Sequence, residues 1–149
     1  MRVPAETVPV DRTELVVAPD NAARVVGERV RRAEESLRIV QVSTGGRHQP
    51  FVRAALRAAR GGVTVQLLLS SAWYARAENR ELVTWLRDVA DREHLPLSAK
   101  LAAPGGRYEK IHAKGVIVDG ERVILGSLNW NNNSARDNRE VALVMEGEA

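Results

Sequence analysis

Hydrophobic and polar positions along the chain follow two periods, one typical of helices and the other typical of strands. The helical period of three to four residues occurs in three segments, residues 22–37, 51–60 and 76–92. Pro50 suits the first turn of the second helix, and Gly61-Gly62 suits its end. Apolar runs, several of them alternating with polar residues, predict strands over residues 13–18, 37–43, 63–69, 97–102, 110–118, 122–125 and 139–145.

The order of these elements indicates the fold class. Strands and helices alternate over the first two thirds, whereas the last third contains strands joined by the Asp119-Gly120 turn and by a polar loop at residues 129–138. This pattern predicts an α/β sandwich, in which a mixed β-sheet is flanked by helices on both faces. The chain has 149 residues and no recognisable linker, so we expect a single domain over residues 1–149.

Composition excludes several classes of protein. The chain has no cysteine, which excludes disulfides, thiolate metal sites and a cysteine nucleophile. No apolar run approaches the roughly 18–20 residues of a membrane span, and no secretory leader is visible, so we expect a cytoplasmic protein without a transmembrane segment. The formal net charge of +3 suits phosphate-bearing partners but is too small to establish nucleic-acid binding by itself.

Candidate chemistry is concentrated in the last third of the chain. His112 and Lys114 are two residues apart on a predicted strand, so their side chains leave the same face. Ser127 and Asn129 have the same spacing where the next strand ends, and Glu140 begins the last strand. An imidazole, an ammonium, a hydroxyl, a carboxamide and a carboxylate brought together at adjacent strand ends can hold a phosphate anion and move a proton.

These residues carry a resemblance to a known family. Without a gap, the chain matches the HKD motif of the phospholipase D superfamily: His112-x-Lys114-x4-Asp119-x6-Gly126-Ser127-x-Asn129. Glu140 stands where many members have a further active-site carboxylate. The resemblance covers most of the chain, and it implies the phospholipase D-like sandwich with the helices and strands described above.

The resemblance also implies a reaction. Members of the family are metal-independent phosphodiesterases in which one histidine attacks phosphorus, forming a phosphohistidine, and a second one protonates the leaving oxygen. Two motifs face one another in the active site, and this chain has one. It is therefore expected to act as a symmetric homodimer, like the small bacterial HKD endonucleases, or as one half of a two-motif enzyme. Neither a metal nor another cofactor is implied.

The resemblance assigns a role to each site residue. The expected catalytic residues are His112, Lys114, Asp119, Ser127, Asn129 and Glu140. Among them, Glu140 is expected to bond a ring nitrogen of a histidine, and Asp119 to support the structure rather than to touch substrate. Substrate contacts are expected from Lys110, Lys114, Ser127, Asn129 and Trp130.

Three functions remain open at this point. The first is non-specific cleavage of DNA or RNA, and the second is phosphatidyl transfer or hydrolysis of the phospholipase D or cardiolipin synthase kind. The third is a non-catalytic module that binds nucleic acid. The complete motif argues against it, because such modules usually lack a motif residue. Trp73 and Tyr74 are able to stack bases, to line a lipid groove or to pack internally, whereas Trp85 is expected in the core.

Overall fold

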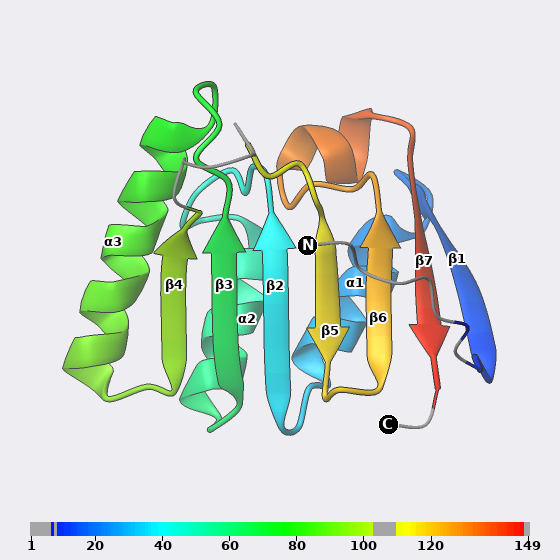
Figure 1. Cartoon of the computed structure of the whole chain (residues 1–149), viewed down its shortest axis with the longest axis horizontal. Helices are drawn as coiled ribbons and strands as arrows, with labels where there is room; N and C mark the ends of the chain where they lie inside the picture. Colours follow the sequence, from blue (N-terminus) through cyan, green and yellow to red (C-terminus); the bar gives the residue numbers. More distant parts are fainter. Residues whose placement is uncertain (1–6, 8, 103–109, 148–149) are drawn as a thin grey trace.

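A computed structural model describes residues 7, 9–102 and 110–147 of the chain (Figure 1). In these ranges the strands are β1 (Arg12–Ala18), β2 (Ser36–Gln41), β3 (Thr64–Leu69), β4 (Leu97–Leu101), β5 (Gly115–Val118), β6 (Arg122–Gly126) and β7 (Glu140–Glu146). The α-helices are α1 (Ala22–Arg31), α2 (Pro50–Arg60) and α3 (Arg76–Glu93), and a short π-helix, η1 (Asn133–Asp137), precedes β7. None of the helices in the described ranges combines the length and the apolar composition that crossing a bilayer requires.

The strands form one mixed sheet in the order β1-β7-β6-β5-β2-β3-β4 (Figure 1). Strands β2, β3 and β4 are parallel and are connected through α2 and α3, whereas every other pair is antiparallel. The α/β class and the mixed sheet predicted from the sequence are therefore confirmed. The carboxyl ends of β2, β3, β4 and β6 and the start of β7 all lie along the upper edge of the sheet in Figure 1.

One face of the sheet forms the core. Alternate residues of β2 and β3 are buried, as shown by Leu37, Ile39 and Leu69, which are almost fully excluded from water. They pack against the apolar faces of the helices, and α1, α2 and α3 each contribute residues to the same core cluster. This burial is the main source of stability, because apolar area removed from water contributes roughly 25 cal/mol per Å².

The placement of the helices differs from the expectation that they cover both faces. In the described part of the chain, all three α-helices pack on the core face, and the opposite face carries no helix (Figure 1). The reason lies in the strand order. The chain moves in one direction from β2 to β3 to β4, so two right-handed crossovers place α2 and α3 on the same side, and the antiparallel strands β5, β6 and β7 are joined without a crossover α-helix.

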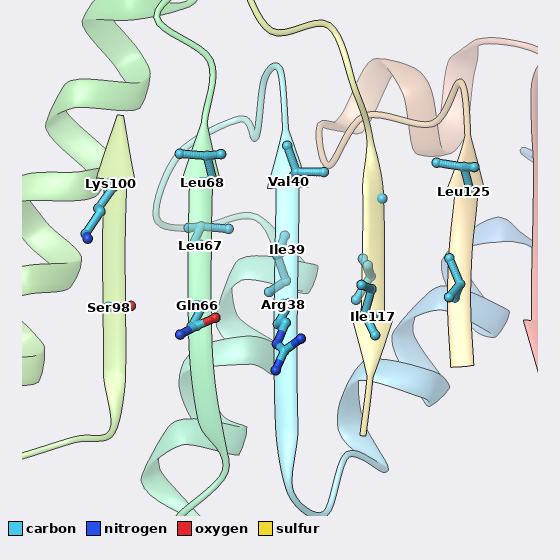
Figure 2. Close-up of a pocket in the computed structure, with 13 residues that line it drawn as sticks. Arg38, Ile39, Val40, Gln66, Leu67, Leu68, Ser98, Lys100, Ile117 and Leu125 are labelled. Atoms are coloured by element: carbon cyan, nitrogen blue, oxygen red, sulfur yellow. The ribbon is translucent and has the colours of Figure 1, made fainter. Parts of the chain in front are cut away.

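The open face is largely apolar. A row of directly paired residues crosses all seven strands at one level: Leu15, Leu143, Leu125, Gly115, Val40, Leu68 and Lys100. Gly115 has no side chain, which leaves a depression between Val40 and Leu125. This depression is part of a hollow of about 490 Å³ that continues toward Arg38, Gln66 and Ser98 (Figure 2).

Two element boundaries differ by more than two residues from those predicted. The first helix ends at Arg31 rather than at residue 37, because Ser36 begins β2 and has to be extended there. The strand predicted over residues 110–118 is paired only over Gly115–Val118. Its neighbour β2 ends at Gln41, and Gly115 pairs with Val40, so the preceding residues run beyond the sheet edge, carrying His112 with them.

Candidate active site

Three adjacent strands bring the candidate residues to one edge of the sheet. His112 and Lys114 precede β5, Ser127 and Asn129 follow β6, and Glu140 begins β7. The order β7-β6-β5 makes these three segments neighbours, and Ser127 continues the ladder by donating its backbone N–H to the carbonyl oxygen of Val141 at 2.9 Å. The five residues that the sequence predicts together are thus brought to the same edge.

Gly126 permits the close approach of β6 and β7 directly beneath the site. A Cβ at this position would overlap the carbonyl oxygen of Val141 and the Cα of Ala142. Both are backbone atoms, so neither can move aside without opening the sheet. The glycine of the motif is therefore required by packing, and it fixes where Ser127 emerges.

His112 and Lys114 are in direct contact. The Lys114 Nζ lies 3.0 Å from His112 Nδ1 and donates a hydrogen bond of 2.9 Å to the His112 carbonyl oxygen. The imidazole is exposed, whereas Lys114 is only 7% exposed. The edge thus presents an accessible imidazole next to a buried ammonium.

The electrostatics of Lys114 suit an anionic ligand. Burial lowers the pKa of its ammonium, and the nearby carboxylate of Glu140 acts in the opposite direction with a smaller effect. A charge that has lost part of its hydration gains more from a new anionic partner than a fully solvated one does. Lys114 is therefore poised to bind an oxyanion that arrives beside His112.

Glu140 bonds a serine rather than a histidine in this chain. The Ser127 hydroxyl donates a short hydrogen bond to Glu140 Oε2, and the Asn138 amide donates to Glu140 Oε1 at 3.3 Å. The backbone N–H of Val141 donates to the Ser127 hydroxyl oxygen at 3.1 Å. The described residues thus form no hydrogen bond between Glu140 and a histidine of the same chain, and Ser127 is held by its neighbours on β7.

Asn129 and Lys110 complete the expected substrate contacts. The Oδ1 atom of Asn129 is buried without a hydrogen-bond partner among the described residues. Such an atom is costly unless a donor reaches it, which makes the carboxamide available to a ligand or water. Lys110 is exposed, with its Nζ 5.9 Å from the centre of the Tyr74 ring.

Asp119 is a correction to the expected catalytic set. It follows β5, whereas His112 precedes this strand, so the two residues lie at opposite edges of the sheet (Figure 1). Its carboxylate accepts backbone hydrogen bonds from Glu34, Glu35 and Ser36 at 2.8 to 3.2 Å. The expectation that Asp119 supports the structure agrees with this arrangement, and its inclusion among residues that act on substrate is wrong.

Trp130 is a second correction. It is 1% exposed and packs in the core with its ring centre 5.5 Å from that of Phe51, so it cannot line a substrate site. The chain turns inward after β6, where the backbone N–H of Trp130 bonds the buried Gln41 side chain and the indole packs on Phe51. Trp85 is half-buried against the core, as expected.

Sequence reasoning missed one positioning residue, Gln41. Its side chain is 1% exposed, and its Oε1 accepts the backbone N–H of Trp130 at 3.0 Å. The bond joins the end of β2 to the segment that carries Asn129. A glutamine at the end of an apolar strand is the available signal, since a buried amide needs a partner.

The described residues offer no cluster of three or more histidine, aspartate or glutamate side chains arranged to hold a metal ion. The edge presents the imidazole of His112 and the ammonium of Lys114, together with a hydroxyl, a carboxamide and the carboxylate of Glu140.

Comparison with known proteins gives the following similarities. A family model described as "Cardiolipin synthase, PLD-like domain" matches residues 26–149. A search of curated protein sequences gave no match.

Several solved structures share the fold. NucT from Helicobacter pylori is 25% identical, with a TM-score of 0.71 over 91% of this chain and 85% of its own. Nuc from Salmonella typhimurium, described as a phospholipase D family member, is 24% identical, with a TM-score of 0.68 over 91% of this chain and 83% of its own. The phosphatidylserine synthase of Haemophilus influenzae Rd KW20 is 14% identical, with a TM-score of 0.71 over 90% of this chain but 34% of its own.

Proposed function

The chain belongs to the PLD-like domain family, and from this membership we propose that it is a metal-independent phosphodiesterase that cleaves nucleic acid as a homodimer. One observation carries the proposal. The exposed imidazole of His112 stands against the buried ammonium of Lys114, with 3.0 Å between His112 Nδ1 and Lys114 Nζ. A nucleophile paired with a desolvated cation is what attack on a phosphodiester anion requires.

The second copy supplies the second histidine. Attack on phosphorus leaves an alkoxide that needs a proton, and His112 cannot serve as nucleophile and proton donor in one step. The motif occurs once in this chain. A twofold axis that passes beside the exposed edge would bring the partner subunit's His112 to the other side of the same phosphorus.

The proposed reaction has two steps. A ring nitrogen of His112 forms a bond to phosphorus while the P–O bond to the leaving group breaks, and the partner's His112 donates its proton to the departing oxygen. Water then attacks phosphorus, the P–N bond breaks, and the water proton passes to the partner's His112. During both steps Lys114 and Asn129 would hold the nonbridging oxygens, while Ser127 and Glu140 would keep the β6 and β7 ends in place.

Phosphatidyl transfer is the second candidate. The matching family model is described as a cardiolipin synthase domain, and a phosphatidylserine synthase shares the fold. Both reactions need the same attack on a phosphodiester, so the geometry around His112 serves either. Nucleic acid is preferred on the resemblance of the single motif to the small bacterial HKD endonucleases and on the positive net charge.

The test uses the purified chain in EDTA with three substrates: a plasmid, a single-stranded oligonucleotide and vesicles that contain a fluorescent phospholipid. Nucleic-acid cleavage that survives EDTA and is lost in His112→Gln supports the proposal. Lipid turnover with nucleic acid intact would transfer the function to the second candidate. Light scattering gives the mass in solution, and a strictly monomeric active enzyme would contradict the dimer.

A further inference from the structure

Two aromatic side chains project into solvent from the sheet edge that carries His112. Trp73 is 83% exposed and Tyr74 is 47% exposed, in the connection between β3 and α3. Their rings form an edge-to-face pair with centres 5.5 Å apart. An indole this accessible gains nothing from burial within the described chain, and the two adjacent rings together offer aromatic surface to a ligand.

The backbone of the β3–α3 connection, which carries both rings, is fixed by burial and by hydrogen bonds. Ser70, Ser71, Ala72 and Ala75 on either side are all buried. Asn79 lies fully buried beneath the connection, and its side-chain amide donates to the carbonyl oxygens of Ser70 and Val42, each at 2.8 Å. Further bonds of 2.9 to 3.2 Å run from the backbone N–H of Ala72, Ala75 and Arg76 to acceptors within the same turn. The rings are therefore presented on a pre-organised support, which lowers the entropy cost of binding.

A positive charge links the rings to the reaction centre. The Lys110 Nζ lies 5.9 Å from the centre of the Tyr74 ring, a distance at which a cation is attracted to the ring face. Lys110 precedes His112 by two residues, so the Cα atoms of the two lie within roughly 7 Å of one another. It forms no ion pair with any of the described residues.

We propose that Trp73, Tyr74 and Lys110 form a platform that stacks unpaired bases of a single-stranded nucleic acid while its backbone crosses His112. The proposal rests on the proposed function and makes it narrower, because it names the substrate as single-stranded. Aromatic faces bind bases of any sequence, and a cation beside them binds the intervening phosphates. In a duplex the bases are stacked on one another and leave no free face for the rings.

A membrane surface is the other partner that exposed aromatics can serve. Here the exposed residues at the start of α3 include the charged Arg76 and Glu78. Charged side chains in this turn oppose insertion of the segment into the apolar layer of a membrane, because burying a charge is costly. The combination of two rings and a cation beside a phosphodiester site therefore favours a nucleic acid.

The binding test uses His112→Gln, so that no substrate is consumed. Tryptophan emission is followed during titration with oligo(dT), with a duplex of matched length and with an abasic oligonucleotide of the same backbone. Trp73 is the most exposed indole in the described chain, since Trp130 is buried and Trp85 half-buried, so stacking on it should quench the emission. We expect oligo(dT) to bind at least about tenfold more tightly than the abasic strand or the duplex.

Substitutions on the same background locate the effect. Trp73→Ala and Tyr74→Ala should each weaken oligo(dT) binding about tenfold, while Trp73→Phe keeps the affinity and loses the quenching. Leu15→Ala, at an exposed apolar position on β1, is the matched control and should change neither the affinity for oligo(dT) nor the quenching. Equal affinity for all three ligands, or unchanged affinity in Trp73→Ala/Tyr74→Ala, would overturn the platform.

The outcomes separate this proposal from the proposed function. Base-dependent binding in the absence of any cleavage by the unsubstituted chain would leave the platform standing and remove the nuclease. Cleavage of duplex and single strand at equal rates, unchanged in Trp73→Ala/Tyr74→Ala, would keep the nuclease and refute the platform. Binding to phosphatidylglycerol vesicles that these substitutions abolish, with no response to oligo(dT), would assign the rings to a lipid surface and refute the platform.

Discussion

The carboxylate of Asp119 accepts a hydrogen bond of 2.8 Å from the backbone N–H of Glu35, which lies 84 residues earlier in the chain. The same carboxylate also accepts the backbone N–H groups of Glu34 and Ser36. These bonds join the turn after β5 to the start of β2, so the motif's aspartate ties together the two strands at the centre of the sheet. Asp119 therefore supports the site indirectly, by stabilising the pairing of β2 with β5, the strand that follows His112 and Lys114.

Asp119→Asn should destabilise the protein without changing the chemistry of the site. A carboxylate that accepts several backbone N–H groups contributes roughly 1.5–3 kcal/mol, and an amide offers one acceptor oxygen where the carboxylate offers two. We expect the free energy of unfolding in urea to fall by about 2 kcal/mol, while kcat below the melting transition changes little. Glu121→Gln, at an exposed position of the same turn, is the control and should have no effect. A large fall in kcat with unchanged stability would return Asp119 to the catalytic set.

Asp119 also gives the fold a specific sensitivity to acid. Burial acts to raise its pKa, but the three backbone N–H groups and Arg122 together outweigh burial and hold the pKa below the ordinary value of 3.8. A lowered pKa in the folded state means that the stabilisation is fully present above this ordinary value and is lost as the pH falls through the lower folded value. Urea unfolding from pH 6 to pH 2 should therefore show a steeper loss in the parent than in Asp119→Asn. Parallel curves for the two proteins would rule this out.

Lys114→Met should separate activity from stability. Burial lowers the pKa of the ammonium below 10.5, so the charged form is disfavoured in the folded protein. Removing the charge relieves this cost and offsets the loss of the hydrogen bond from Lys114 Nζ to the His112 carbonyl oxygen. We expect unchanged or higher stability at pH 7 and at least a 100-fold loss of kcat, since an electrostatic contact to the reacting phosphoryl is removed. The folded-state pKa is below the unfolded one, so stability of the parent should rise with pH in the alkaline range below 10.5, and Lys114→Met should lack part of this rise.

The control for this variant is Lys100→Met, which removes an exposed lysine from β4. It should keep both the activity and the pH dependence of unfolding. If Lys114→Met were markedly less stable at pH 7, the lysine would be part of the structural framework and not held ready for an anion.

Gly126→Ala should damage the site through the sheet. The added methyl group would overlap backbone atoms of Val141 and Ala142, so β6 and β7 must separate where Ser127 and Glu140 meet. Overpacking of this kind costs about 1–3 kcal/mol or more, and displaced donors should lower kcat together with the melting temperature. Gly27→Ala is the matched comparison. There the nearest atom is the flexible end of the Arg31 side chain, and alanine in α1 should stabilise by about 0.4–1 kcal/mol.

The part of the site that the sequence predicts best depends on local spacing. His112 with Lys114, and Ser127 with Asn129, are pairs at a separation of two on extended backbone, and the structure brings both pairs to one edge. The same rule, applied further, would have corrected one expectation. Asp119 is seven residues from His112, which at about 3.3 Å per residue is more than the length of the four-residue β5 between them. Trp130 directly follows Asn129 and is buried in the core.

Other features depend on contacts that local patterns do not contain. Helices on one face follow from the spatial order of β2, β3 and β4 and the handedness of their connections, whereas apolar spacing gives only each helix's own buried side. The Ser127–Glu140 bond depends on the register of β6 and β7, in which Gly126 pairs with Ala142. Trp73 is exposed while the serines and alanines around it are buried. Hydrophobicity alone predicts the opposite, with the tryptophan inside and the serines in solvent.

The apolar row across the open face affects the solubility of the purified chain. Leu125 and Leu143 are direct cross-strand neighbours and remain about half accessible to water. Salts that are excluded from protein surfaces strengthen attraction between such stripes, so turbidity of the purified chain should rise steeply with ammonium sulfate. Threonine at these two positions keeps the preference for a strand and weakens the attraction between molecules. The double substitution should therefore allow the protein to be concentrated further before it precipitates.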